Sequence, residues 1–289
     1  MTMWQKHIIG LAGMMLGCVW QLSAQSDAML SQYFLTPIYY NAGAAGTSDG
    51  LNIIATGQLQ RHTDIMYRNA GIGADIPVAV GGSDNLGIGI TTGYTCAGDY
   101  RGLSASLPLS WRLKAGNGHI SIGIAPGVSD GKITADKKTH KTRGDFGAGL
   151  WYSSKVFRAG ISATHIGQKH RDTCAGTAFY AFAAGNTAIR GTLLDIEPSI
   201  LIARRTGDFI GQISLRAIWK RVLWAGAGYR LHESAVVMLG ISIKGLKAGY
   251  SYLLPSKHLH GGHELMAGYS CGINTQKSPT GRHKSVRLM

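Results

Sequence analysis

The residues with the clearest potential for chemistry lie in one stretch near the carboxyl end of the chain. His258, His260, His263 and Glu264 form a His-x-His-x-x-His-Glu run, and imidazole and carboxylate groups are common zinc ligands. The run does not lie on a helical pattern that would bring these side chains to one point. We therefore interpret the histidines as polar residues of a loop and of the strand that follows it, and we predict no metal site and no cofactor.

Other short motifs do not indicate catalysis. Gly87-Ile88-Gly89 and Gly226-Ala227-Gly228 lie inside alternating stretches rather than between a strand and a helix, so a phosphate-binding loop is not expected. Acidic residues are few and scattered, and no nucleophile motif stands beside them. We predict that the protein is not an enzyme.

The composition narrows the class of protein. The chain has 289 residues with 41 Gly and only 7 Pro, and charged residues make up 15% of it, against about 25% in typical soluble domains. It carries 29 Lys and Arg against 15 Asp and Glu, which gives a net charge of +14. Low charge density with a basic excess fits contact with nucleic acid or with anionic lipid.

The amino terminus predicts export. Lys6 precedes an apolar run over 8–20, and small residues at 22–24 precede Gln25, as in a secretory signal peptide covering residues 1–24. An alternative interpretation takes Cys18 as the acylated residue of a lipoprotein. Either route takes the chain out of the cytoplasm, which argues against a nucleic-acid role. No later apolar run is long enough for a transmembrane helix.

The cysteines that remain after cleavage are sparse. Cys96, Cys174 and Cys271 are an odd number and do not form a disulfide framework. Cys96 and Cys174 are expected at the same end of the molecule, where an oxidising compartment would permit a bond. We favour unpaired thiols, because the sequence does not show that two α-carbons come within bridging distance.

From Leu51 onward, large apolar residues alternate with small or polar ones. Such period-2 stretches, about ten residues long and separated by turns, are typical of two-sided β-strands. The stretch 246–254 is a clear example, since Leu246, Ala248 and Tyr250 alternate with Lys247 and Gly249. The pattern predicts fourteen strands, at 51–60, 70–79, 86–96, 100–114, 119–130, 144–153, 156–168, 177–187, 193–204, 209–219, 222–232, 235–243, 246–254 and 263–272.

The two faces of these strands favour a membrane barrel over a soluble sandwich. The second face carries many Gly, Ser, Ala and Thr residues but few charges, as expected where the first face meets lipid and the second lines a lumen. Closure of the barrel would satisfy every backbone group. We therefore predict an all-β fold, a transmembrane antiparallel β-barrel of about 14 strands of the outer-membrane type.

The lengths of the connections predict how the barrel is oriented. The longest connections, at 131–143, 169–176 and 255–262, alternate with short turns, and outer-membrane barrels place long loops outside and short turns in the periplasm. We expect residues 25–50 to form a periplasmic segment that packs on or in the barrel, and 51–272 to form the barrel. Residues 273–289 would be a basic periplasmic tail, and the last strand would pair with the first near Leu51.

Motifs at both ends of the barrel carry a resemblance to a known family. They are Ser31-Gln32-Tyr33, Pro37 and the Asn41–Gly46 run at the start, and Gly249–Tyr252, Gly261–Glu264 and Gly268-Tyr269 at the end. The chain resembles the PorP/SprF family of type IX secretion system membrane proteins, found in Bacteroidetes. Two positions depart from its opening pattern, Thr36 in place of Asn and Ala42 in place of Pro.

The resemblance implies a non-enzymatic outer-membrane barrel that serves protein export or gliding motility. It would dock or anchor ring components of the secretion machinery, or exported cargo proteins with a C-terminal secretion signal. The family motifs suggest candidates for partner docking, which are Tyr33, Pro37, Asn41, Gly46, His263 and Glu264.

A second hypothesis from the residues themselves is a porin for small anionic solutes. It would use basic groups on the expected lumen face, which are Arg158, Arg216 and Lys244.

Overall fold

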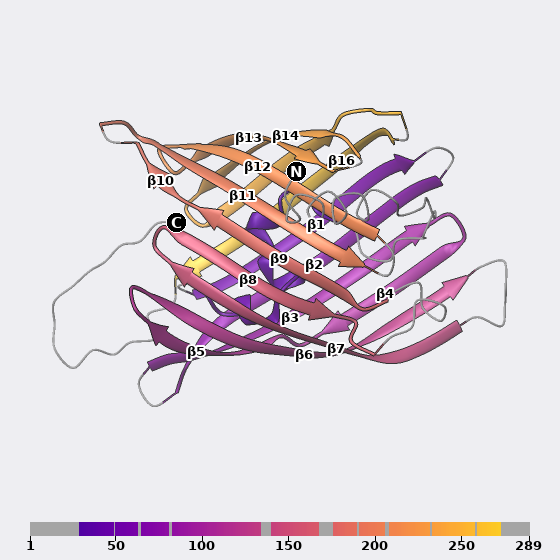
Figure 1. Cartoon of the computed structure of the whole chain (residues 1–289), viewed down its shortest axis with the longest axis horizontal. Helices are drawn as coiled ribbons and strands as arrows, with labels where there is room; N and C mark the ends of the chain where they lie inside the picture. The colour runs from indigo at the N-terminus through magenta and orange to yellow at the C-terminus, as the bar shows by residue number, and fades with distance from the viewer. Residues whose placement is uncertain are drawn as a thin grey trace, which may run out of the picture.

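A computed structural model describes most of the chain (Figure 1). The described residues are 29–48, 50–62, 65–80, 83–133, 140–167, 176–189, 191–205, 208–231, 233–257 and 259–272. The predicted signal peptide at 1–24, the predicted tail at 273–289, Cys18, Cys174 and His258 lie outside them. Among the described residues, no helix is long and apolar enough to span a membrane.

The strands form one antiparallel sheet that closes on itself. They are β1 (Gly50–His62), β2 (Ile65–Val80), β3 (Ser83–Ala97), β4 (Tyr100–Ser106), β5 (Leu109–Ala115), β6 (Gly118–Ile133), β7 (His140–Ser154), β8 (Phe157–Thr164), β9 (Ala178–Gly185), β10 (Thr187–Ala188), β11 (Leu194–Arg205), β12 (Asp208–Trp219), β13 (Leu223–Arg230), β14 (Ala235–Ile243), β15 (Leu246–Leu253) and β16 (Leu259–Gly272).

Closure occurs where β1 pairs with β16, with Leu51 opposite Cys271, as the sequence predicts. β4 and β5 share one position between β3 and β6, and β10 continues β9 along β11. The fold is therefore a closed antiparallel 14-strand barrel, which confirms the predicted fold class. Figure 1 shows the tilted strands that wrap around a common interior.

One predicted strand, 100–114, is interrupted. Pro108 has no N–H group and cannot donate to the sheet. The break between β4 and β5 is bridged by single bonds, in which the Leu107 amide donates to Pro126 (2.9 Å) and the Gly89 amide donates to Pro108 (2.8 Å). The wall stays continuous although the strand does not.

The two faces of the wall differ as their alternation predicts. On β6, Ile120, Ile122 and Ile124 are exposed on the outside, whereas Ser121 and Gly123 are buried on the inside. Each of the remaining full-length strands also carries exposed large apolar residues. An apolar outer surface of this kind is suited to lipid.

The two ends of the barrel differ in the length of their connections. One end, here called the short-turn end, carries the β7–β8, β12–β13 and β14–β15 turns. The other, the long-loop end, carries the β6–β7, β8–β9 and β15–β16 connections. The long-loop end also carries two-residue connections between β1 and β2, β3 and β4, and β11 and β12. The two longest connections, β6–β7 and β8–β9, nevertheless lie at this end, as the sequence predicts.

Candidate functional site: a segment held inside the barrel

Residues 29–48, here called the lumen segment, lie inside the barrel (Figure 1, indigo). The segment makes three 3-10 turns, η1 (Tyr33–Leu35), η2 (Pro37–Tyr39) and η3 (Ala42–Ala44). Pro37 begins η2, where its fixed backbone angle suits a first turn. Most of the side chains between Met29 and Ala45 are buried. The segment therefore occupies space in the interior that a hollow barrel would leave to water.

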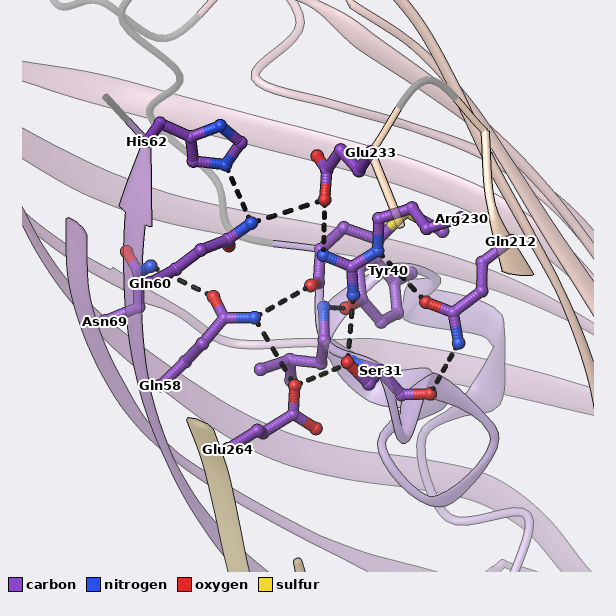
Figure 2. Close-up of polar contacts among 12 residues, drawn as sticks. Ser31, Tyr40, Gln58, Gln60, His62, Asn69, Gln212, Arg230, Glu233 and Glu264 are labelled. Carbon is purple, nitrogen blue, oxygen red and sulfur yellow. Dashed lines mark hydrogen bonds and ion pairs between the residues drawn. The ribbon is translucent and has the colours of Figure 1, made fainter. Parts of the chain in front are cut away.

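The start of the lumen segment is bound by a carboxylate of the wall. Glu264 of β16 is 1% exposed, and it accepts the backbone amides of Ser31 (2.7 Å) and Gln32 (3.1 Å). Gln58 of β1 donates from its side chain to the Met29 carbonyl (3.2 Å) and to Glu264 (3.4 Å). Figure 2 shows these side chains converging on the segment. A buried carboxylate thus fixes two backbone donors that would otherwise lack partners.

An arginine three strands away along the wall, on β13, binds the same turn. Arg230 of β13 is 1% exposed, and it donates to the Ser31 hydroxyl (3.0 Å), to Gln212 (3.1 Å) and to Glu233 (3.0 Å). Gln212 in turn donates to the Ser31 carbonyl (2.9 Å). We call Ser31, Gln58, Gln212, Arg230, Glu233 and Glu264 the polar anchor (Figure 2). It ties β1, β12, β13 and β16 to one turn of the lumen segment.

Aromatic side chains pack η1 against the wall. Tyr33 is fully buried and meets Phe182 edge-on, and Phe34 meets Trp224 in the same way. The Arg216 guanidinium lies 4.4 Å from the centre of the Phe34 ring, a distance typical of cation–π contact. Burial raises the pKa of the Tyr33 phenol, so the phenol stays protonated and can donate to the Gln212 carbonyl (3.3 Å).

Asn41 holds the middle of the lumen segment. Its side-chain amide donates to the carbonyls of Leu150 (2.9 Å) and Ile161 (3.1 Å), and its oxygen accepts the Gly43 amide (2.9 Å), which caps η3. The wall opposite Asn41 has a glycine, because a Cβ on Gly149 would lie 2.1 Å from the Asn41 oxygen.

Two further wall glycines let the lumen segment lie directly against the strands. A Cβ on Gly123 would lie 2.3 Å from the Ala42 carbon and the Gly43 nitrogen, and one on Gly87 would lie 2.1 Å from the Ala45 oxygen. These are backbone atoms that cannot swing away as a side chain could. The small residues on the inner face are therefore needed for the fit of the segment.

The segment leaves the lumen at the short-turn end. The Gly46 amide donates to Asp75 of β2 (2.8 Å), and Ser110 of β5 donates to the Ala45 carbonyl (2.8 Å). Gly46 has a φ of +62°, which glycine adopts without strain. The chain then turns into β1, so the segment spans from the polar anchor to the start of the barrel wall.

A chamber remains beside the segment toward the long-loop end. Its volume is about 160 Å³, and its lining includes Tyr39, Tyr100, Tyr180 and Ser104. His165 and Asp145 also line it and pair with each other at 2.7 Å. Apolar side chains such as Leu30 and Ile38 line it as well, so the chamber has a mixed lining and offers polar partners to water.

The six residues suggested by the family motifs fall into two places. Tyr33, Pro37, Asn41, Gly46 and Glu264 all belong to the lumen segment or its contacts, and of these only Pro37 is partly exposed. His263 is exposed on the outer face, where it bonds with the Tyr250 hydroxyl (2.8 Å). Partner docking through the buried residues stays a prediction, and it would require the segment to leave the lumen.

The other candidates from the sequence are placed as follows. His263 and Glu264 point to opposite faces of β16, and the described residues contain no group of three potential metal ligands. Cys96 and Cys271 are free thiols. Arg158 and Arg216 lie inside the barrel and both bind Glu197, at 3.1 and 2.9 Å. Lys244 is an exposed residue of the β14–β15 turn, so its assignment to the lumen face was wrong.

Arg230, Gln212 and Gln58 form much of the polar anchor, and none of them was a candidate from the sequence. Each lies on the inner parity of its strand, so parity could have placed them in the lumen. Gln58 lies on β1, far in the sequence from β12 and β13, which carry the other two. No local sequence pattern could therefore predict that all three contact the lumen segment together.

An apolar outer wall, a closed antiparallel sheet and a polar, filled interior define an outer-membrane β-barrel protein. The family model described as type IX secretion system membrane protein PorP/SprF matches residues 22–269. The chain belongs to this family, which confirms the resemblance seen in the sequence motifs.

Comparison with curated proteins gives no match. Among solved structures, the outer membrane protein Omp33 of Acinetobacter baumannii is 10% identical with a TM-score of 0.49, over 76% of this chain and 97% of that one. The KdgM porin is 9% identical with a TM-score of 0.36, over 76% and 99%. The translocator domain of the autotransporter NalP from Neisseria meningitidis is 14% identical with a TM-score of 0.32, over 92% and 98%.

Proposed function

We propose that the protein is a non-enzymatic scaffold of the type IX secretion and gliding machinery, which docks or anchors ring subunits or exported cargo at the outer membrane. The short-turn end would face the periplasm and the long-loop end the cell exterior, in line with the usual arrangement in such barrels. In this orientation the periplasmic ring would meet the short turns, and exported cargo would be held at the long-loop end.

The observation that carries the proposal is the filled lumen. The lumen segment is bonded to the wall at its start by Glu264 and Arg230, in its middle by Asn41, and at its end by Asp75. A buried segment with partners along its length makes the barrel a rigid body. Such a body can hold a partner at its ends without conducting solutes.

The alternative, a porin for small anionic solutes, requires cations on the lumen wall that are free to meet an anion. Arg158 and Arg216 instead both bond to Glu197, and Arg216 also lies against the Phe34 ring. Both guanidiniums are therefore held by protein contacts, although the single carboxylate of Glu197 neutralises only one of the two charges. The contacts support the scaffold rather than the porin.

Affinity purification from outer membranes tests the scaffold. A tagged copy of the chain, crosslinked in its native membrane, is expected to recover secretion ring components or proteins with a C-terminal secretion signal. A tagged, unrelated barrel expressed at the same level is the control and should recover neither. Recovery of only the barrel and general outer-membrane proteins would contradict the docking role.

A further inference from the structure

Basic side chains form one row around part of the outer wall near the long-loop end. The row follows direct cross-strand partners, in which Arg68 of β2 pairs with Cys96 of β3, and Cys96 pairs with Arg101 of β4. Arg101 in turn lies opposite Lys132 of β6. Adjacent strands are about 4.8 Å apart, so three cations lie on one short arc. We call Arg68, Arg101 and Lys132 the basic row.

The basic row faces outward. All three side chains are exposed, and each lies on the same parity as apolar residues that face lipid, such as Ile72 (56% exposed), Leu103 (58%) and Val128 (53%). These apolar neighbours lie toward the middle of the barrel, and the basic residues follow at the long-loop side. On β2 one exposed apolar residue of the same face, Met66 (40%), lies beyond Arg68 toward that end. The row therefore lies close to the boundary between the apolar band and the headgroup layer of the membrane.

The position of these charges is unfavourable for the barrel alone. Arg101 and Lys132 are direct cross-strand neighbours, and like charges in that arrangement destabilise a sheet. Among the described residues, neither they nor Arg68 has an ion pair with an acidic side chain. Asp130, on the same face and two residues from Lys132, accepts the neutral Thr142 hydroxyl (2.9 Å) and keeps its charge. Three cations thus face one carboxylate, and an anion outside the protein would offset the remaining excess of positive charge.

The location limits which anion this is. A group at the boundary of the apolar band belongs to a lipid headgroup, and phosphate is the anion that arginine binds in a bidentate way. With the long-loop end outside, the headgroups at this height are those of the outer leaflet. Lipid A-type glycolipids of that leaflet carry phosphates on a sugar backbone.

We propose that Arg68, Arg101 and Lys132 form a binding site for the phosphate groups of an outer-leaflet glycolipid. The site rests on the proposed orientation of the barrel but not on its docking role. It would fix the rotation of the barrel relative to neighbouring lipid, because the row covers only the β2–β6 side of the wall.

Native mass spectrometry of the detergent-purified, full-length protein with diphosphoryl lipid A tests the site. Each basic residue near an anionic membrane surface contributes about five-fold to affinity. Replacing all three in R68Q/R101Q/K132Q is therefore expected to weaken lipid A binding by about a hundred-fold. Wild-type protein is expected to bind lipid A lacking both phosphates as weakly as this variant binds the intact lipid.

The matched control removes three exposed cations from turns at the short-turn end, in K155Q/K220Q/K244Q. It changes the net charge equally and is expected to leave lipid A binding unchanged. Heat-modifiable migration on gels confirms that each variant is folded. Equal weakening by both triple variants, wild-type affinity in R68Q/R101Q/K132Q, or equally tight binding of phosphatidylglycerol would overturn the assignment.

Discussion

Replacing Gly123 with alanine should drive the lumen segment away from the wall. The added Cβ would lie 2.3 Å from two backbone atoms of the segment, the Ala42 carbon and the Gly43 nitrogen. Neither the β6 backbone nor η3 can yield by a side-chain rotation, so the segment must shift as a unit. Overpacking of this kind costs about 1 to 3 kcal/mol, which corresponds to about a 5- to 150-fold larger population of the released segment.

Hydrogen exchange measured by mass spectrometry reports that population directly, because exchange of buried amides follows local opening. Amides of the lumen segment should exchange about 5- to 150-fold faster in Gly123→Ala than in wild type. Amides of β1 should stay protected in both. The matched control is Gly57→Ala, since a Cβ on Gly57 meets nothing within 4 Å. Unchanged protection in Gly123→Ala, or an equal loss in Gly57→Ala, would refute the steric reasoning.

Three further substitutions test individual contacts of the lumen segment. Glu264→Gln replaces a carboxylate that accepts two backbone amides by a group with one acceptor oxygen. Hydrogen exchange of those two amides should become about ten-fold faster or more. The control His263→Gln, on the outer face, should leave their exchange unchanged. Asn41→Ala removes three hydrogen bonds of about 1 kcal/mol each, so exchange should rise around η3 while the barrel stays folded, and unchanged exchange there would contradict the role of Asn41. Glu197→Gln leaves Arg158 and Arg216 without their carboxylate and should destabilise the barrel by about 3 kcal/mol. The heat-modifiable shift on gels should then occur at a lower temperature. An unchanged temperature would show that the two ion pairs of Glu197 do not stabilise the fold.

The strands could be predicted from the sequence because their signal is local. Each wall residue faces either lipid or the lumen, so apolar and small or polar residues alternate along every strand. The alternation stops where a turn begins, which marks the end of the strand. The long and short connections then follow from antiparallel order. The exception is the break at Pro108, in a stretch whose alternation continues through it. Pro77, Pro126 and Pro198 lie inside unbroken strands, so proline alone does not predict the break.

The contacts of the lumen segment could not be predicted in this way. Glu264 reaches Ser31 across 233 positions of the sequence, and Arg230 reaches it across 199. The inner parity of both residues is visible in the sequence, but their meeting point depends on the path of a segment that has no repeating pattern. The glycines on the inner face are the clearest sequence feature that marks where the segment lies, because they occur where its backbone approaches the wall.

Planar-bilayer recording tests the central claim, that the lumen segment makes the barrel a filled scaffold. The purified wild-type protein is expected to show almost no steady conductance. A variant lacking residues 29–48, folded as judged by heat-modifiable migration, is expected to show stepwise open currents. Steady open conductance of the wild-type protein, equal to that of the deletion variant, would contradict the claim.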